Sequence, residues 1–225
     1  ANSTVINTSG MQNISNGGIA NNTNINSGGT QNISEGGYAT DVLNEGIVNL
    51  SSGGNLSNYS GNGKLYVYGN NVINGNTNLA TGQLVFANNT PTTLNIKHLS
   101  ANNAVISMGV NLENQTADTL VVQSSYNGNT KLSLRNTATV ANPTSEEGIK
   151  LVDFDDNAII NGTFELLGGK WDEGGYIYTL NQNTSDNDYY LKTTGAYSDS
   201  FKTMANVPML NAVIAKAGMN SLNKR

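Results

Sequence analysis

Acidic side chains gather at one place where their chemistry could matter, the segment DFDDN. Asp153, Asp155 and Asp156 are the densest group of carboxylates in the chain, and carboxylates are ligands that Ca²⁺ prefers. The segment lacks the central glycine and the terminal glutamate of an EF-hand loop. Elsewhere, the glycine pairs lack the Gly-x-Asp pattern of calcium-binding nonapeptides. The spacing therefore favours a solvated turn over a calcium site.

Histidine-based chemistry has a single candidate, because His98 is the only histidine in the chain. One imidazole assembles neither a His-based metal site nor a Ser-His-Asp triad, and we expect an exposed or capping residue. The pairs Glu146–Glu147 and Asp172–Glu173 lie beside turn residues, which is typical of solvated carboxylates. We predict no catalytic, cofactor-binding or metal-binding residue.

Charge is scarce and unevenly distributed. Charged residues make up 12% of the chain, roughly half of the ordinary share. The acids before Glu113 are Glu35, Asp41 and Glu45, and the bases there are Lys64 and Lys97. A net charge of −5 without a basic cluster gives no footprint for nucleic acid. The absence of cysteine excludes disulfides and fits a chain that crosses a cell envelope unfolded.

An internal repeat decides the fold class. The segment INTSGMQNISNGGIA (6–20) aligns without gaps to INSGGTQNISEGGYA (25–39), and LNEGIVNLSSGGNL (43–56) is a shorter third copy. Each copy has only two isolated apolar positions, so it cannot bury a core alone, whereas stacked copies can. The alignment predicts one inward column of Ile6, Ile25 and Leu43 and another of Ile14, Ile33 and Leu50. Helical periodicity is absent, and we predict a right-handed parallel β-helix.

The polar residues of the repeat also align. Glycine pairs recur at the corners, where the positive φ of a tight turn is needed; they are Gly17, Gly18, Gly36, Gly37, Gly53 and Gly54. Asn13, Asn32 and Asn49 share one position, so their amides could stack as a ladder. Beyond residue 58 the repeat decays, but short strands are still predicted at 65–68, 84–86, 94–96 and 104–108.

From about residue 115 the strands become longer and more apolar, and aromatic residues accumulate. The end of a solenoid exposes an open strand edge that invites aggregation unless it is capped. We expect a β-rich structural cap built on Trp171, Gly174, Gly175, Tyr176, Tyr178 and Tyr190. Gly174–Gly175 predicts a turn that folds Trp171 back over the following strand. Trp171 is then substantially buried core, although a sugar-stacking platform is the alternative reading.

These segments resemble a known family. The repeats at 4–57 resemble those of the AIDA and antigen 43 group of self-associating autotransporters. The blocks ADTLVVQ, GNTKLSL, GIKLVDF, GTFELL, DEGGYIYTL and DYYLKT, in this order over 117–193, resemble the pertactin-type C-terminal passenger region, often called the autochaperone. The resemblance implies a passenger exported through a C-terminal outer-membrane β-barrel. It also implies adhesion, autoaggregation or biofilm formation at the cell surface.

Three regions are expected: β-helix repeats over 1–114, a pertactin-like cap over 115–198 and a helical linker over 199–225. Pro208 could start the linker helix, with Leu210, Val213, Ile214 and Ala217 at helical spacing. The family places such a helix inside the barrel pore; an amphipathic helix packed on its own domain is the alternative.

Three functions remain open from the sequence. The first is a surface-displayed module of adhesion and self-association, whose partners are copies of itself on neighbouring cells or host glycans or proteins. The second is a carbohydrate-active β-helix enzyme, although paired carboxylates are missing from the repeats. The third is a device that mainly promotes folding and export. The expected location is the bacterial cell surface or outer membrane.

Overall fold

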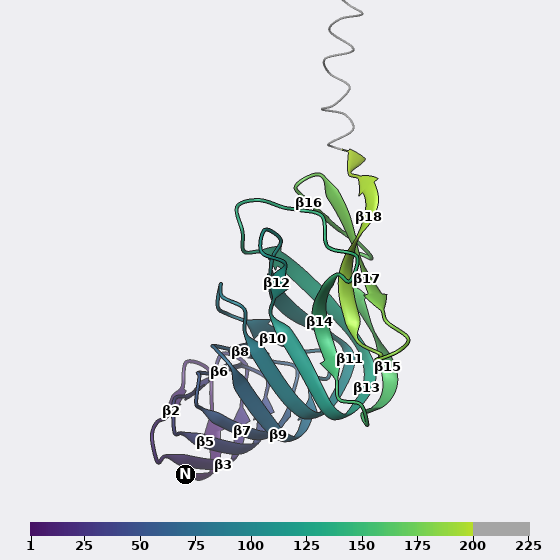
Figure 1. Ribbon diagram of the computed structural model, residues 1–225. Coiled ribbons are helices and arrows are strands. Elements are labelled where there is room, and N and C mark those ends of the chain that lie inside the picture. Colours follow the sequence, from purple (N-terminus) through teal and green to yellow (C-terminus); the bar gives the residue numbers. More distant parts are fainter. Residues whose placement is uncertain (200–225) are drawn as a thin grey trace, which may run out of the picture.

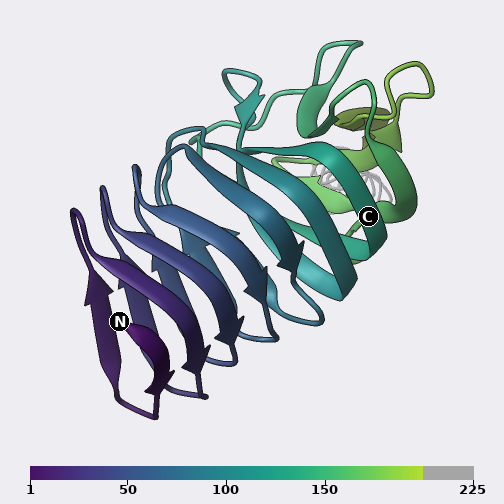
Figure 2. The same cartoon turned by 90° about the horizontal axis from the view of Figure 1, so that it is seen from below.

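The chain folds as a parallel β-helix, whose rungs stack from the N-terminal end towards a capped C-terminal end (Figure 1). The computed structural model describes residues 1–199. Successive rungs lie side by side, with short strands on one wall and longer, curved strands on the other (Figure 2). Within the described part, no helix is long and apolar enough to cross a membrane.

The strands lengthen along the chain as the repeat becomes less regular. They are β1 (Asn2–Ile6), β2 (Met11–Ile14), β3 (Ile19–Ile25), β4 (Thr30–Ile33), β5 (Tyr38–Asn44), β6 (Ile47–Leu50), β7 (Asn55–Ser60), β8 (Lys64–Val67), β9 (Asn71–Asn78), β10 (Gln83–Phe86), β11 (Thr93–Asn111), β12 (Thr116–Ala117), β13 (Thr119–Asn136), β14 (Ile149–Phe154), β15 (Ile159–Leu166), β16 (Trp171–Glu173), β17 (Tyr176–Gln182) and β18 (Tyr189–Tyr197).

Each early rung has three sides. In the second rung, residues 19–21 of β3 form the first side, residues 23–25 form the second side, and β4 forms the third side. The bend between the first two sides is Asn22, which has a left-handed φ of 55°. The same position is Ser3, Asp41 and Asn58 in the neighbouring rungs, all with positive φ. Asparagine and aspartate tolerate this conformation better than most residues, which explains why they recur there.

Parallel pairing between rungs puts like side chains on top of one another. One inward column on the third side is Ile14, Ile33, Leu50, Val67 and Phe86. On the first side the inward column is Ala20, Ala39, Leu56, Ile73, Ile96, Val122 and Phe154. All of these side chains are buried, and each large one contributes roughly 1.5–3 kcal/mol of hydrophobic stabilisation. The predicted column of Ile14, Ile33 and Leu50 is therefore confirmed.

The other predicted column is wrong at its third member. Ile6 pairs with Ile25, but Ile25 pairs with Asn44, and Leu43 points outward with 45% of its surface exposed. The third rung is two residues shorter than the second, and the loss falls in the corner after Asn44 instead of before Leu43. Leu43 is apolar and lies close to the expected repeat offset, so the sequence alignment placed it opposite Ile25, one residue before the true partner Asn44.

Asn44 is a buried polar residue whose hydrogen bonds are satisfied. Its Nδ2 donates to the Tyr59 hydroxyl at 2.9 Å and to the Lys64 carbonyl at 3.1 Å. Its Oδ1 accepts from the backbone N–H of Gly46 at 2.9 Å. These hydrogen bonds offset the cost of burying the amide and connect Asn44 to its own corner and to the next rung.

The parallel ladder continues beyond residue 114. β13 pairs in parallel with β11 along almost its whole length, and β14 and β15 pair in parallel with β13. Antiparallel pairing occurs where the short β12 pairs with the end of β11, where β18 adds to the free edge of β14, and where β16, β17 and β18 pair in sequence. The division at 114/115 stays a prediction. The expected linker helix beyond Asp199 lies outside the described residues.

The register can be tested with two alanine variants of residues that the sequence placed in one column. Ile25→Ala should lower the free energy of unfolding by about 2–5 kcal/mol, because it leaves a cavity in the core. Leu43→Ala should change it by less than about 0.5 kcal/mol, because the side chain is half exposed. Urea denaturation followed by circular dichroism measures both, and equal losses would contradict the observed register.

Candidate interaction faces and cap

The acidic and histidine candidates take part in local structure. Asp153 accepts a hydrogen bond from Lys150 at 2.8 Å, whereas Asp155 and Asp156 are exposed in the turn between β14 and β15. His98 Nδ1 lies 2.9 Å from the Ser125 hydroxyl of the next rung. Among residues 1–199 no three metal-ligating side chains of histidine, cysteine or acid type come together.

The three aligned asparagines lie on the outward surface of the third side. Asn32 Nδ2 donates to Asn13 Oδ1 at 2.6 Å, and Asn49 Nδ2 donates to Asn32 Oδ1 at 2.7 Å. The column continues through Tyr66 and Val85. Rungs are spaced by about 4.8 Å, which suits amide-to-amide bonding along the stack. The outward surface here is uncharged over three rungs and rich in hydrogen-bonding groups.

Glycine pairs occupy the corners between the third side and the following first side, and their two members differ. The first glycine of each pair has positive φ: 75° at Gly17, 69° at Gly36 and 76° at Gly53. The second does not, so the first member of each pair supplies the positive φ that was expected of the corner. A Cβ on Gly37 would lie 2.5 Å from the Ile14 carbonyl oxygen of the preceding rung. Gly18 and Gly54 are similarly crowded, so the second position needs glycine for close packing.

The cap contains a tight hairpin. Gly174 and Gly175 have φ values of 56° and 89° and connect the paired residues Glu173 and Tyr176. Two successive residues of positive φ make the two-residue turn that suits the twist of a hairpin. Opposite each other on the two strands lie Trp171 and Tyr178, with ring centroids 5.5 Å apart.

Burial within the cap differs from one aromatic side chain to the next. Tyr178 is completely buried, and its hydroxyl donates to the Asn142 carbonyl at 2.7 Å. Trp171 packs against the core but is only partly buried. Most of the Trp171 surface is therefore covered, as expected, although its paired residue Tyr178 is buried more deeply. Tyr176 is half-buried, and Tyr190 is 6% exposed.

Aromatic rings close the end of the hydrophobic core. Tyr126 stacks on Phe164 with ring centroids 4.5 Å apart, and Tyr189 of β18 meets Phe164 edge-on at 5.4 Å. The Tyr126 hydroxyl lies 3.0 Å from both the Thr130 hydroxyl and the Thr163 carbonyl. These large side chains cover the last rung, where no further rung provides packing.

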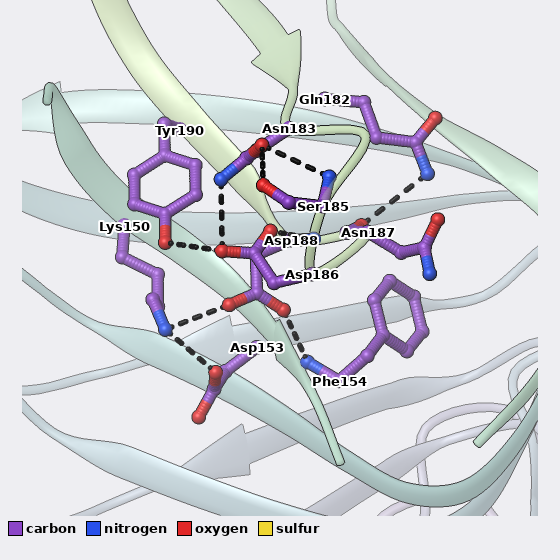
Figure 3. Close-up of polar contacts among 10 residues, drawn as sticks. All are labelled: Lys150, Asp153, Phe154, Gln182, Asn183, Ser185, Asp186, Asn187, Asp188 and Tyr190. Atoms are coloured by element: carbon purple, nitrogen blue, oxygen red, sulfur yellow. Dashed lines mark hydrogen bonds and ion pairs between the residues drawn. The ribbon is translucent and has the colours of Figure 1, made fainter. Parts of the chain in front are cut away.

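A buried carboxylate fixes the start of β18 to the edge of β14 (Figure 3). Asp188 is 2% exposed and accepts hydrogen bonds from the Phe154 backbone N–H at 2.7 Å and from Lys150 Nζ at 2.7 Å. The antiparallel pairing of β14 with β18 ends at Val152 and Tyr189. Just beyond it, the Asp188 carboxylate accepts the Phe154 N–H in place of a backbone carbonyl. Asp186 accepts from the Asp188 backbone N–H and from the Tyr190 hydroxyl, which orders the turn before β18.

Burial and hydrogen bonding shift the pKa values of Asp188 and Lys150 in opposite directions. Burial raises the pKa of Asp188 above its ordinary value, while hydrogen bonds from Lys150 and Phe154 act in the other direction. Burial disfavours the Lys150 ammonium, but hydrogen bonds to Asp153 and Asp188 outweigh it and raise the Lys150 pKa. The ion pair therefore offsets part of the cost of burying the carboxylate, whose pKa stays raised.

Sequence reasoning missed Lys150 and Asp188. The segment NTSDND (183–188) reads as a loop, and nothing in its composition shows that one of its carboxylates is buried. The only available signal was the density of Asn, Ser and Asp, which is typical of side-chain-stabilised turns.

Asp188 variants test the contact between cap and solenoid. Asp188→Ala should lower the free energy of unfolding by roughly 2–4 kcal/mol, because it leaves the Phe154 N–H without a partner. Asp188→Asn should cost less, about 1–2 kcal/mol, because an amide oxygen can still accept that bond. As a control, Asp172→Asn removes the exposed pair with Lys170 and should change stability by less than about 0.5 kcal/mol. Chemical denaturation compares them, and equal effects of Asp188→Ala and the control would refute the anchoring role.

Buried tyrosines predict alkaline unfolding. Burial, as the largest cause, raises the pKa of Tyr59, Tyr126 and Tyr178 to about 12 each, whereas unfolded tyrosine has a pKa near ~10. Between these values the unfolded chain loses protons that the folded chain keeps, so stability falls as pH rises. Each tyrosine should contribute up to about 1.4 kcal/mol per pH unit in this window. Denaturation between about pH 9 and 11.5 measures the slope. It should become shallower in Tyr178→Phe; an unchanged slope would argue against this linkage.

The Pertactin family model matches residues 72–193, which is more than half of the chain. The crystal structure of the Haemophilus influenzae Hap adhesin is similar, with a TM-score of 0.52 and 19% identity over 82% of this chain. This chain spans 24% of the Hap chain.

A hyper-glycosylated fragment of TibA gives a TM-score of 0.34 and 18% identity, over 72% of this chain and 81% of that fragment; this score is too low to indicate a common fold. No curated protein matches. The Hap likeness shows the β-helix fold, and by the match over 72–193 the chain belongs to the Pertactin family.

Proposed function

We propose that this chain is part of a surface-displayed autotransporter passenger that acts in adhesion and self-association between bacterial cells. The observation that carries the proposal is the third side of the rod. Its outward positions on β2, β4, β6, β8 and β10 contain no carboxylate and one lysine; they are Met11, Asn13, Thr30, Asn32, Ile47, Asn49, Lys64, Tyr66, Gln83 and Val85.

A flat, nearly uncharged surface can contact a second copy without like-charge repulsion. Side chains on successive rungs offer hydrogen-bonding groups about every 4.8 Å along the rod. Each such bond is weak because water competes for it, but many copies on two cell surfaces add their contributions by multivalency. Autoaggregation and biofilm formation at the bacterial surface follow from this mode of contact. AIDA or antigen 43 membership of the repeats at 4–57 is part of the proposal.

The C-terminal part has a second role in the proposal, which is to promote folding and export of the passenger towards its own outer-membrane barrel. The support is the closed C-terminal edge. β18 pairs with the free edge of β14, and Asp188 fixes its start. A rung that is capped on one edge can template, on its other edge, the parallel strands that stack on it. No catalytic step belongs to the proposal, because the acids of the repeats lie in separate corners and bends.

Cell settling tests the adhesive face. The variant Asn13→Asp/Gln83→Glu adds two negative charges to the third side at exposed positions, and the carboxylate introduced at position 13 can still accept the bond from Asn32. Bacteria that display the full-length protein should settle through self-association, and the variant should settle much more slowly in low salt. Settling should partly recover in high salt, because ions screen exposed charges.

The matched control is Asn24→Asp/Asn127→Asp, which adds the same charge to outward positions of the second side. It should settle like the unmodified protein. Surface display of each variant is measured with an antibody, so that lost export is not mistaken for lost adhesion. Unchanged settling of the third-side variant at equal display would overturn the choice of face, and no settling of the unmodified protein would overturn self-association.

A further inference from the structure

A hollow of about 420 Å³ lies on the outer surface at the bend between the first and second sides. It spans three rungs, on the neighbouring strands β5, β7 and β9 (Figure 1). Its outward-facing lining is Asp41, Leu43, Asn58, Ser60, Asn76 and Asn78, here called the Asp41 hollow. Its volume lies in the range of small-ligand sites, and it is separate from the third side.

One carboxylate is held in place within the hollow. Asp41 Oδ1 accepts from Asn58 Nδ2 at 3.0 Å, and its Oδ2 lies 3.3 Å from the Thr40 hydroxyl, which donates to it. Asn58 is fixed in turn, because its Oδ1 accepts the backbone N–H of Asn76 at 3.0 Å. Each carboxylate oxygen can accept more than one hydrogen bond. The held carboxylate therefore keeps acceptor capacity for a ligand with adjacent hydroxyl groups.

Donors surround this acceptor. Within residues 1–199, the Nδ2 groups of Asn76 and Asn78 and the hydroxyl of Ser60 make no hydrogen bond, while Asn78 Oδ1 is used by the backbone N–H of Ala80 at 2.9 Å. With Asn78 oriented in this way, its donor group is available to the hollow. The polar groups together can both donate to and accept from one ligand.

Leu43 gives the hollow an apolar surface. It stands between Asn24 and Ser60 in its outward column and is 45% exposed. An exposed apolar side chain among amides and hydroxyls suits a ligand that has a polar rim and a C–H face. Ring hydroxyls and ring C–H groups give sugars this combination.

We propose that the Asp41 hollow binds a neutral sugar residue of a surface glycan. The inference rests on the proposed adhesive function and names a partner for a face that self-association does not use. Vicinal hydroxyls donate to Asp41, the Asn76 and Asn78 amides donate to ring or hydroxyl oxygens, and Leu43 packs against the C–H face.

Charge selects neutral sugars over acidic ones. The only charged side chain of the hollow is Asp41, and the chain carries a net charge of −5. A sialic or uronic acid would bring a second carboxylate close to Asp41 without a cation in the hollow to pair with it. Repulsion between the two carboxylates, and the loss of water from a carboxylate that gains no cation partner, then disfavour acidic glycans.

Glycan arrays and saturation-transfer NMR with the 225-residue chain test the proposal. The array carries oligosaccharides ending in glucose, galactose, mannose or fucose, together with sialylated and uronic-acid glycans, and the strongest neutral binder is titrated by NMR. Asp41→Asn should weaken that binding at least about tenfold, as expected for loss of a charged hydrogen bond. The bend tolerates asparagine, because Asn22 and Asn58 hold it in adjacent rungs with φ of 55° and 52°.

Leu43→Asn should also weaken binding of the neutral glycan, because it removes the apolar surface. The matched control is Val5→Asn, in the same outward column and 58% exposed but outside the hollow. It should bind like the unmodified chain. Absence of neutral glycan binding, preference for acidic glycans, or equal loss in Leu43→Asn and Val5→Asn would each overturn the proposal.

Settling of cells that display Leu43→Asn separates this proposal from self-association. Retained settling with lost glycan binding is the expected result. Lost settling, with no glycan bound by the unmodified chain, would mean that the hollow contacts a second copy; this would overturn the sugar site and leave self-association standing. Glycan binding by an unmodified protein that does not settle would overturn self-association and support the sugar site.

Discussion

Parallel backbone hydrogen bonding from one rung to the next holds every other feature of this protein in place. A single rung has too few apolar side chains to bury a core, so its strands are stable only when the neighbouring rung fixes their register. That register aligns the inward columns, such as Ile14, Ile33 and Leu50, and on the outer surface it aligns Asn13, Asn32 and Asn49. The core and the uncharged outer surface of the third side therefore have the same origin.

The sequence predicted those parts of the fold that repeat. Two nearly identical copies were enough to infer the β-helix, the column through Ile33 and the recurring glycine corners. Prediction failed where a rung changes length, because Leu43 and Asn44 are adjacent and only the structure shows which one pairs with Ile25. The glycine pairs looked equivalent, yet one member is set by φ and the other by contact with the preceding rung.

The cap was predicted as a region but not in its contacts. Aromatic composition and Gly174–Gly175 indicate a hairpin, which forms as a two-residue turn. Trp171 and Tyr178 share one face of the hairpin, and the deeper burial of Tyr178 depends on its tertiary contact with the loop around Asn142, which local sequence does not encode. The Asp188 contact joins segments 34 residues apart, so only tertiary structure brings it together. The Asp41 hollow likewise needs three rungs at once.

The shortened third corner has an evolutionary consequence. Two residues fewer after Asn44 leave the pairing of both flanking strands intact, and the next rung keeps the same short corner with Gly61 at this position. Corners can thus gain or lose residues while the ladders on either side stay aligned, whereas a change inside a strand would turn its side chains to the opposite face. Exposed corners on such a rod can therefore change in length without a new folding problem, so tolerance of sequence change and structural constancy are located in different residues.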